Sequence, residues 1–288
     1  HDLRNFQTRH VENIVWAWGK LAFKHRVFLR DACAGVPPRI GEFTARGLSN
    51  IVYSLALLRQ RDTSLLGPMC DHVPSRLGEF TPQGIANIVY GLALLRFHAD
   101  GLMQAFCGAA TPMLRSFKTQ ELSIMVYSCG LLGYKHKVFL EEVSLQSPGM
   151  LTDFTEQNIS NLVHGLGLLE YRNDFLVQAV CEHTSPRLGG FTAQGLANTT
   201  HALGAMRVRG DRCALVPALC AHAPGRIREF SPLHLWVTAL ALARMGFRHP
   251  GVLRSGRTAR LDLCRRRGEP RLLGRGTGPE SPAAEREQ

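Results

Sequence analysis

Apolar residues along this chain follow helical spacing, and the pattern starts again every 37 residues. Leu48, Ile51, Val52 and Leu55 share one helical face, and a matching face returns in each later copy. A phenylalanine opens every copy, at five intervals of 37 residues and a last interval of 39. These anchor residues are Phe6, Phe43, Phe80, Phe117, Phe154, Phe191 and Phe230. Intervals this regular indicate an array of one repeated unit.

The residues beside each anchor predict where the first helix of the unit begins. Thr44 follows Phe43, as expected of an N-cap residue, and Pro82 takes the first helical position of the next copy. Phe43 precedes the cap and Leu48 lies at the fourth helical position, which is the pairing of a hydrophobic staple. We therefore expect a helix of about four turns that starts at the residue after the anchor.

A second apolar run, such as Val27-Phe-Leu or Val138-Phe-Leu, predicts a second helix in each unit. Proline cannot continue a helix without losing a hydrogen bond, and one follows each of these runs. These prolines are Pro37, Pro74, Pro112, Pro148, Pro186 and Pro224. A helix pair this short cannot bury both apolar faces alone, so neighbouring units must stack. The predicted fold is all-α: a right-handed α-solenoid of about seven 37-residue helix-turn-helix repeats.

The array is expected to cover residues 1–250. Residues 251–288 are rich in Arg, Gly and Pro without an apolar period, and we expect them to be disordered. The sequence opens on His1 inside a repeat, so we expect an incomplete N-terminus with no visible targeting segment. Apolar stretches are too short for a membrane span, and we expect no membrane association.

Histidine and cysteine suggest a metal site, but the repeat argues against one. Cys70 and His72 form a Cys-x-His pattern that returns at Cys181 and Cys220. Residues at one repeat position lie roughly 10 Å apart in a helical stack, whereas Zn–S bonds are about 2.3 Å long. We expect small residues packed on the second helix, and no metal or cofactor. No phosphate loop, nucleophile elbow or paired carboxylates stand out, so we also expect no enzymatic activity.

Three positions of the first helix, three, seven and ten residues after the anchor, share the face opposite the apolar stripe. Their side chains, which we call the amide–aromatic ribbon, are Arg46, Asn50, Tyr53, Gln83, Asn87, Tyr90, Gln120, Tyr127, Gln157, Asn161, His164, Gln194, Asn198 and His201. Ile124 and Val237 interrupt the asparagine series. Amides can pair with base edges and aromatic rings can stack on bases, so the ribbon suits single-stranded RNA. The alternative is structural: each Asn bonds the backbone of the neighbouring repeat and the rings pack between helices.

Basic side chains recur eighteen residues after each anchor. These turn cations are Lys24, Arg61, His98, Lys135, Arg172, Arg209 and Arg248. Arg59, Arg96 and Arg207 lie beside them. A cation at a helix C-terminus gains about 0.3–1 kcal/mol from the helix dipole, which is the structural explanation. Complete recurrence favours a track for a phosphate backbone instead.

A second basic row lies four residues before the anchor. These pre-anchor arginines are Arg39, Arg76, Arg187 and Arg226. We interpret them as part of the same phosphate track. The formal net charge of +11, of which about +7 belongs to residues 1–250, agrees with a polyanionic partner.

The stretch Glu79-Phe-Thr-Pro-Gln-Gly-Ile-Ala-Asn-Ile-Val-Tyr resembles the octotricopeptide and heptatricopeptide repeat families, which are related to RAP-domain and FAST-kinase-like organellar proteins. The resemblance implies a mitochondrial or plastid protein that binds single-stranded RNA, about one base per repeat, with organellar ribosome or RNA-processing proteins as further partners. Transcript stabilisation, processing, translation or ribosome assembly are the implied roles. No RAP domain is visible. The alternative function is a protein–protein interaction scaffold that binds an extended peptide in the concave face.

Overall fold

A computed structural model describes residues 6–247, and every regular element in this range is helical. The prediction of an all-α fold is confirmed. Arg248 and the segment 251–288, which we predicted to be disordered, lie outside the described residues. No described helix is long and apolar enough to cross a membrane.

The first helices of the units begin two residues after their anchors, one residue later than predicted, because the residue after the anchor is the N-cap. They are α1 (Thr8–Leu21), α3 (Ala45–Leu57), α5 (Pro82–Leu94), α7 (Thr119–Leu132), α9 (Glu156–Leu168), α11 (Ala193–Ala205) and α13 (Pro232–Arg244). The cap chemistry is confirmed in α3, where the Thr44 hydroxyl accepts from the Gly47 N–H at 2.9 Å. In α7 the unit lacks this Thr, and the Glu121 carboxylate instead accepts from the Lys118 N–H at 2.9 Å.

The second helices are shorter. They are α2 (Arg26–Gly35), α4 (Thr63–His72), α6 (Asp100–Ala110), α8 (Lys137–Gln146), α10 (Asp174–Thr184) and α12 (Leu215–His222). Each passes into a 3₁₀ helix that has the proline as its first or second residue and ends just before the next anchor. These segments are η2 (Pro37–Glu42), η3 (Val73–Glu79), η4 (Thr111–Ser116), η5 (Ser147–Asp153), η6 (Ser185–Gly190) and η8 (Ala223–Glu229). The one longer interval contains an additional 3₁₀ turn, η7 (Gly210–Arg212).

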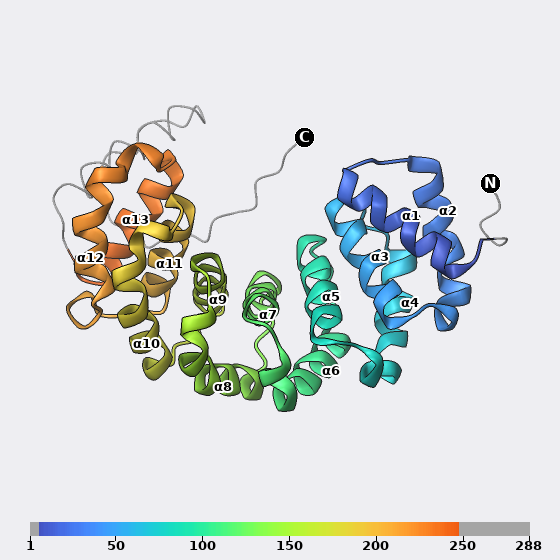
Figure 1. The fold of residues 1–288 in the computed structure, drawn as a ribbon, viewed down its shortest axis with the longest axis horizontal. Coiled ribbons are helices and arrows are strands. Elements are labelled where there is room, and N and C mark those ends of the chain that lie inside the picture. The colour runs from blue at the N-terminus through green and yellow to red at the C-terminus, as the bar shows by residue number, and fades with distance from the viewer. Residues whose placement is uncertain (1–5, 248–288) are drawn as a thin grey trace, which may run out of the picture.

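The units stack in chain order and form an arc (Figure 1). Each first helix packs on the first helix of the next unit, and in Figure 1 α5, α7 and α9 face the inside of the arc while α6, α8 and α10 face the outside. We call the two sets the inner and outer helices. The seventh unit contributes only its inner helix, α13, to the described residues. The handedness of the array remains a prediction.

Small residues explain why the inner helices line the shorter side of the arc. A Cβ on Gly130 of α7 would lie 2.7 Å from the backbone oxygen of Gly165 in α9, so the two helices are in backbone contact. Outer helices pack mainly against the 3₁₀ segments of neighbouring units, for example α6 on η3 and α8 on η4. These segments are inserted between successive outer helices, which spaces the outer layer more widely and bends the stack.

Candidate nucleic-acid interface

The amide–aromatic ribbon lies on the inner helices, which face the inside of the arc, and its side chains are exposed or half-buried. The residues three positions after the anchor, Arg46, Gln83, Gln120, Gln157 and Gln194, are exposed. The Asn, Tyr and His side chains of the ribbon are half-buried. Helical periodicity therefore identified one continuous face.

Five successive inner helices, α3 to α11, enclose a hollow of about 380 Å³ on this face. Its lining includes seven of the predicted residues: Tyr53, Tyr90, Tyr127, Gln157, Asn161, Gln194 and Asn198. Ile124, Ser160, Thr192 and Gly195 complete the lining. The volume lies within the range of about 300–1,000 Å³ that is usual for ligand sites.

The asparagines do not form the backbone ladder that was the structural alternative. Within residues 6–247, Asn50, Asn87 and Asn198 make no hydrogen bond to a neighbouring repeat. Asn161 accepts from Gln157 Nε2 of its own helix at 2.9 Å. These amides therefore keep donors and acceptors for a partner outside the protein.

The aromatic side chains of the ribbon contact each other along the array. Ring centroids are 6.2 Å apart for Tyr53 and Tyr90, and 5.5 Å apart for Tyr127 and His164. The centroids of His164 and His201 are 6.4 Å apart. Part of the structural alternative is thus correct, because the rings pack between helices. Tyr53, Tyr90 and Tyr127 still line the hollow, whereas His164 and His201 do not.

Burial keeps the histidines of the ribbon neutral. Desolvation, followed by the neighbouring His201, lowers the pKa of His164 to about 4. Burial and the charge of Arg244 also lower the pKa of His201. Near neutral pH both rings are uncharged, so they resemble the tyrosines of the other repeats and add no charge to the concave face.

The turn cations follow a turn of the same backbone geometry in every unit. In every unit the residue sixteen positions after the anchor is left-handed, with φ between 47° and 74°: Ala22, Arg59, Arg96, Gly133, Glu170, Arg207 and Gly246. Such a residue ends a helix in a Schellman motif and reverses the chain. The described turn cations, Lys24, Arg61, His98, Lys135, Arg172 and Arg209, are all exposed two residues later. Arg248 lies outside the described residues.

The turn cations differ in how far they are already engaged. Arg172 contacts Asp174 at 2.5 Å and donates to the Arg207 carbonyl at 2.9 Å, and Arg209 contacts Asp211 at 2.7 Å. Lys24 and Lys135 have no ion pair within the described part of the chain. The unpaired members are therefore those most available to phosphate.

The pre-anchor arginines are not part of a phosphate track, and our interpretation of them was wrong. Their side chains are only 18–27% exposed. Arg39, Arg76 and Arg187 donate to the carbonyl oxygens of Phe6, Phe43 and Phe154 at 2.9–3.0 Å, which joins each unit to the preceding one. Each also pairs with a glutamate, so the guanidinium groups are already satisfied.

The fourth pre-anchor arginine, Arg226, pairs with Glu229 at 2.6 Å and donates to the Leu188 carbonyl at 3.3 Å. The same arginines explain part of the Cys-x-His pattern, because His183 contacts Arg187 and His222 lies 3.4 Å from Arg226. Within residues 6–247 no group of three or more His, Cys, Asp or Glu side chains is arranged to hold a metal ion.

Sequence reasoning missed a row of exposed leucines. Leu57, Leu94, Leu131 and Leu168, fourteen residues after their anchors, are 37–42% exposed. They lie four residues beyond the aromatic position, and this spacing places both on one helical face. The helical projection used for the ribbon, extended by one more turn, would have found them.

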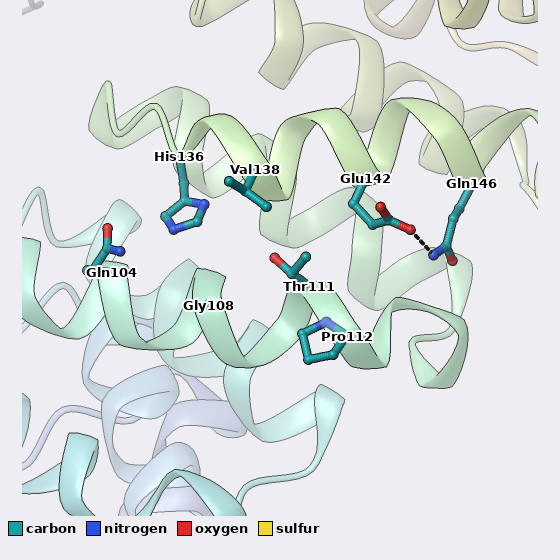
Figure 2. Close-up of a pocket in the computed structure, with 8 residues that line it drawn as sticks. All are labelled: Gln104, Gly108, Thr111, Pro112, His136, Val138, Glu142 and Gln146. Carbon is teal, nitrogen blue, oxygen red and sulfur yellow. Dashed lines mark hydrogen bonds between the residues drawn. The ribbon is translucent and has the colours of Figure 1, made fainter.

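A larger hollow, about 530 Å³, lies between the outer helices α6 and α8 (Figure 2). Gln104, Thr111, His136 and Glu142 line it, and none of the predicted RNA-binding residues does. Figure 2 shows the Gln146 amide donating a hydrogen bond to the Glu142 carboxylate, with both residues on α8. The lining contains the Glu142 carboxylate and neither lysine nor arginine, a composition that does not favour a polyanion, so the concave hollow remains the candidate interface.

One protein-family model, described as RNA-editing substrate-binding complex 6 protein, matches residues 33–266. The chain belongs to this family. The match covers α3 to α13, and therefore the whole of the concave hollow. It places the chain in an RNA-related family of helical proteins, and it is a match to neither the octotricopeptide nor the heptatricopeptide family. No curated protein matches the chain.

Proposed function

We propose that this protein binds single-stranded RNA along the concave face of its inner helices and has no catalytic activity of its own. The observation that carries the proposal is the hollow in which amide and aromatic side chains of five successive inner helices converge. The description of the family, an RNA-editing substrate-binding complex protein, supports an RNA substrate and an assembly of several proteins.

The arrangement suggests how a strand would lie. Amides stand near the N-terminal ends of the inner helices, rings stand in the middle, and turn cations follow the C-terminal ends. A strand that crosses the inner helices would place bases on amides and rings, while its phosphates approach the turns. Affinity should then fall steeply with salt, because each neutralised phosphate releases counterions.

The direct test measures the anisotropy of labelled single-stranded RNA over about 50–200 mM salt. Replacing Lys24, Arg61 and Lys135 with Ala should weaken binding and reduce the slope of log affinity against log salt by about 0.7 per lost phosphate contact. The matched control removes Arg26, Arg30 and Lys137, three exposed cations of the outer helices. Equal effects of the two triple variants, or no binding by the wild type, would overturn the proposal.

The exposed leucine row favours a second candidate, a scaffold that binds an extended apolar peptide in the same concave face. Leucines contribute little to the recognition of a polyanion and suit alternate side chains of a peptide. Binding that is insensitive to salt, and that Leu94→Ser and Leu131→Ser abolish, would favour this scaffold over the RNA-binding protein.

We further propose a mitochondrial or plastid location, in an RNA-editing or RNA-processing assembly or with the organellar ribosome. The family description and the organellar proteins that the repeat resembles support this location. Imaging of the full-length protein with a C-terminal fluorescent tag tests it, and a signal that matches neither organelle would reject it.

A further inference from the structure

The geometry points to the gap between Tyr90 of α5 and Tyr127 of α7 as the place where one unstacked nucleobase of bound RNA inserts. This inference rests on the proposed function and adds to it a position and a mode of base contact. It concerns one interface between inner helices, which differs from its neighbours in ring contacts, packing and lining.

The aromatic rings are in mutual contact on both sides of this gap. The pairs Tyr53–Tyr90 and Tyr127–His164 have centroid distances of 6.2 and 5.5 Å, inside the range of about 4.5–7 Å for touching rings. Rings in contact leave no room for a third ring between them. No such ring contact joins Tyr90 to Tyr127, although the structure describes both residues.

The sequence provides a physical cause for the missing ring contact between Tyr90 and Tyr127. Other inner-helix interfaces contain a glycine at close approach: Gly130 meets Gly165 between α7 and α9, and Gly204 would place a Cβ 2.9 Å from Ala241 between α11 and α13. At the equivalent positions between α5 and α7 the residues are Ala93 and Ser128. Two side chains therefore separate these helices, and α5 and α7 pack less extensively than any other neighbouring inner pair.

The lining beneath the gap suits a base. Ile124, which takes the asparagine position in this repeat, lines the same hollow as Tyr90 and Tyr127. An apolar side chain beside tyrosines in one hollow favours a flat, weakly hydrated ring, and stacking on tyrosines tolerates any base.

Two amide side chains of α9, the inner helix that follows Tyr127, line the same hollow. Gln157 Nε2 donates to Asn161 Oδ1 at 2.9 Å, which fixes both amides. Gln157 Oε1 and the Asn161 NH₂ group are left as an adjacent acceptor and donor. A base edge with one donor and one acceptor, such as adenine presents, complements them.

The experiment uses short single-stranded RNAs that carry one fluorescent 2-aminopurine, moved one position at a time. Stacking between two tyrosines quenches this base, so with saturating protein we expect strong quenching at one position of the oligonucleotide. Tyr127→Leu and Tyr90→Leu should restore the fluorescence and weaken binding roughly tenfold, equivalent to about 1.4 kcal/mol. Tyr127→Phe keeps the ring and should retain the quenching.

His164→Leu is the matched control, because this ring already contacts Tyr127 and His201. It should weaken binding less than Tyr127→Leu does, with the quenching preserved. Circular dichroism melts show which variants keep the fold. If a Leu variant unfolds, the quenching is judged on Tyr127→Phe, which keeps the aromatic ring. RNA binding with normal salt dependence but uniform fluorescence along the oligonucleotide would overturn the insertion site alone. Failure of the wild type to bind any RNA would overturn the proposed function.

Discussion

Two rows of cations repeat with the same period in this protein, and the structure uses them differently. The turn cations follow left-handed residues at the C-terminal ends of the inner helices and are exposed. The pre-anchor arginines lie in the 3₁₀ segments, are mostly buried, and bond the carbonyl oxygens of the preceding unit. The comparison teaches that the period shows which residues recur, whereas neighbouring acids and carbonyl groups determine which cations remain available.

The largest loss of stability is expected when a pre-anchor arginine is removed. Arg187→Ala should lower the free energy of unfolding by about 2 kcal/mol, because hydrogen bonds to charged groups contribute about 1.5–3 kcal/mol and the half-buried Glu156 loses its partner. Urea denaturation measures this change. Lys135→Ala is the matched control and should stay within about 0.5 kcal/mol, since its side chain is exposed. Equal stability of both variants would contradict the comparison.

A smaller change in the free energy of unfolding, this time an increase, is expected when a left-handed turn residue is replaced. Arg96 adopts φ = 50°, a conformation that costs roughly 1–2 kcal/mol with a side chain and little for glycine. Arg96→Gly should therefore stabilise the protein by about 0.5–1 kcal/mol, allowing for the greater entropy of unfolded glycine. It should also weaken RNA binding.

Arg96→Ala separates the two consequences of that change. It removes the charge and keeps the strained backbone, so RNA affinity should fall as in Arg96→Gly without any gain in the thermal midpoint. A glycine variant that melts no higher than the alanine variant would show that the turn stores no strain.

The effect that is smallest at neutral pH concerns the buried histidine His164, because its titration changes stability only below about pH 6.5. The folded pKa of His164, about 4, lies below its ordinary value of 6.5. The unfolded chain therefore binds more protons between these values, and this residue's contribution to stability is present above pH 6.5 and is lost as the pH falls toward 4. His164→Tyr, which copies Tyr127, should flatten that part of the profile of unfolding free energy against pH. An unchanged profile would mean that another group titrates there.

The candidate site was predictable to the extent that it follows helical geometry. Tyr53, Gln157 and Asn198 were assigned to one face from spacing alone, and they line one hollow in the structure. The pre-anchor arginines were misassigned because a decisive partner, such as the Phe43 carbonyl of Arg76, belongs to another unit and meets the arginine only on stacking. The break between Tyr90 and Tyr127 also needed the structure, since it depends on how closely two helices approach.

The sequence by itself determined the period, the caps, the all-α class and the composition of the concave face, because these follow from local spacing and from backbone hydrogen bonding at helix ends. Tertiary structure alone decided which cations are already paired, which amides stay free and where the row of rings opens. Those outcomes depend on contacts between different units, whose distances are set by the packing of small and large side chains. The repeated motif alone does not predict these contacts, because each copy has different neighbours.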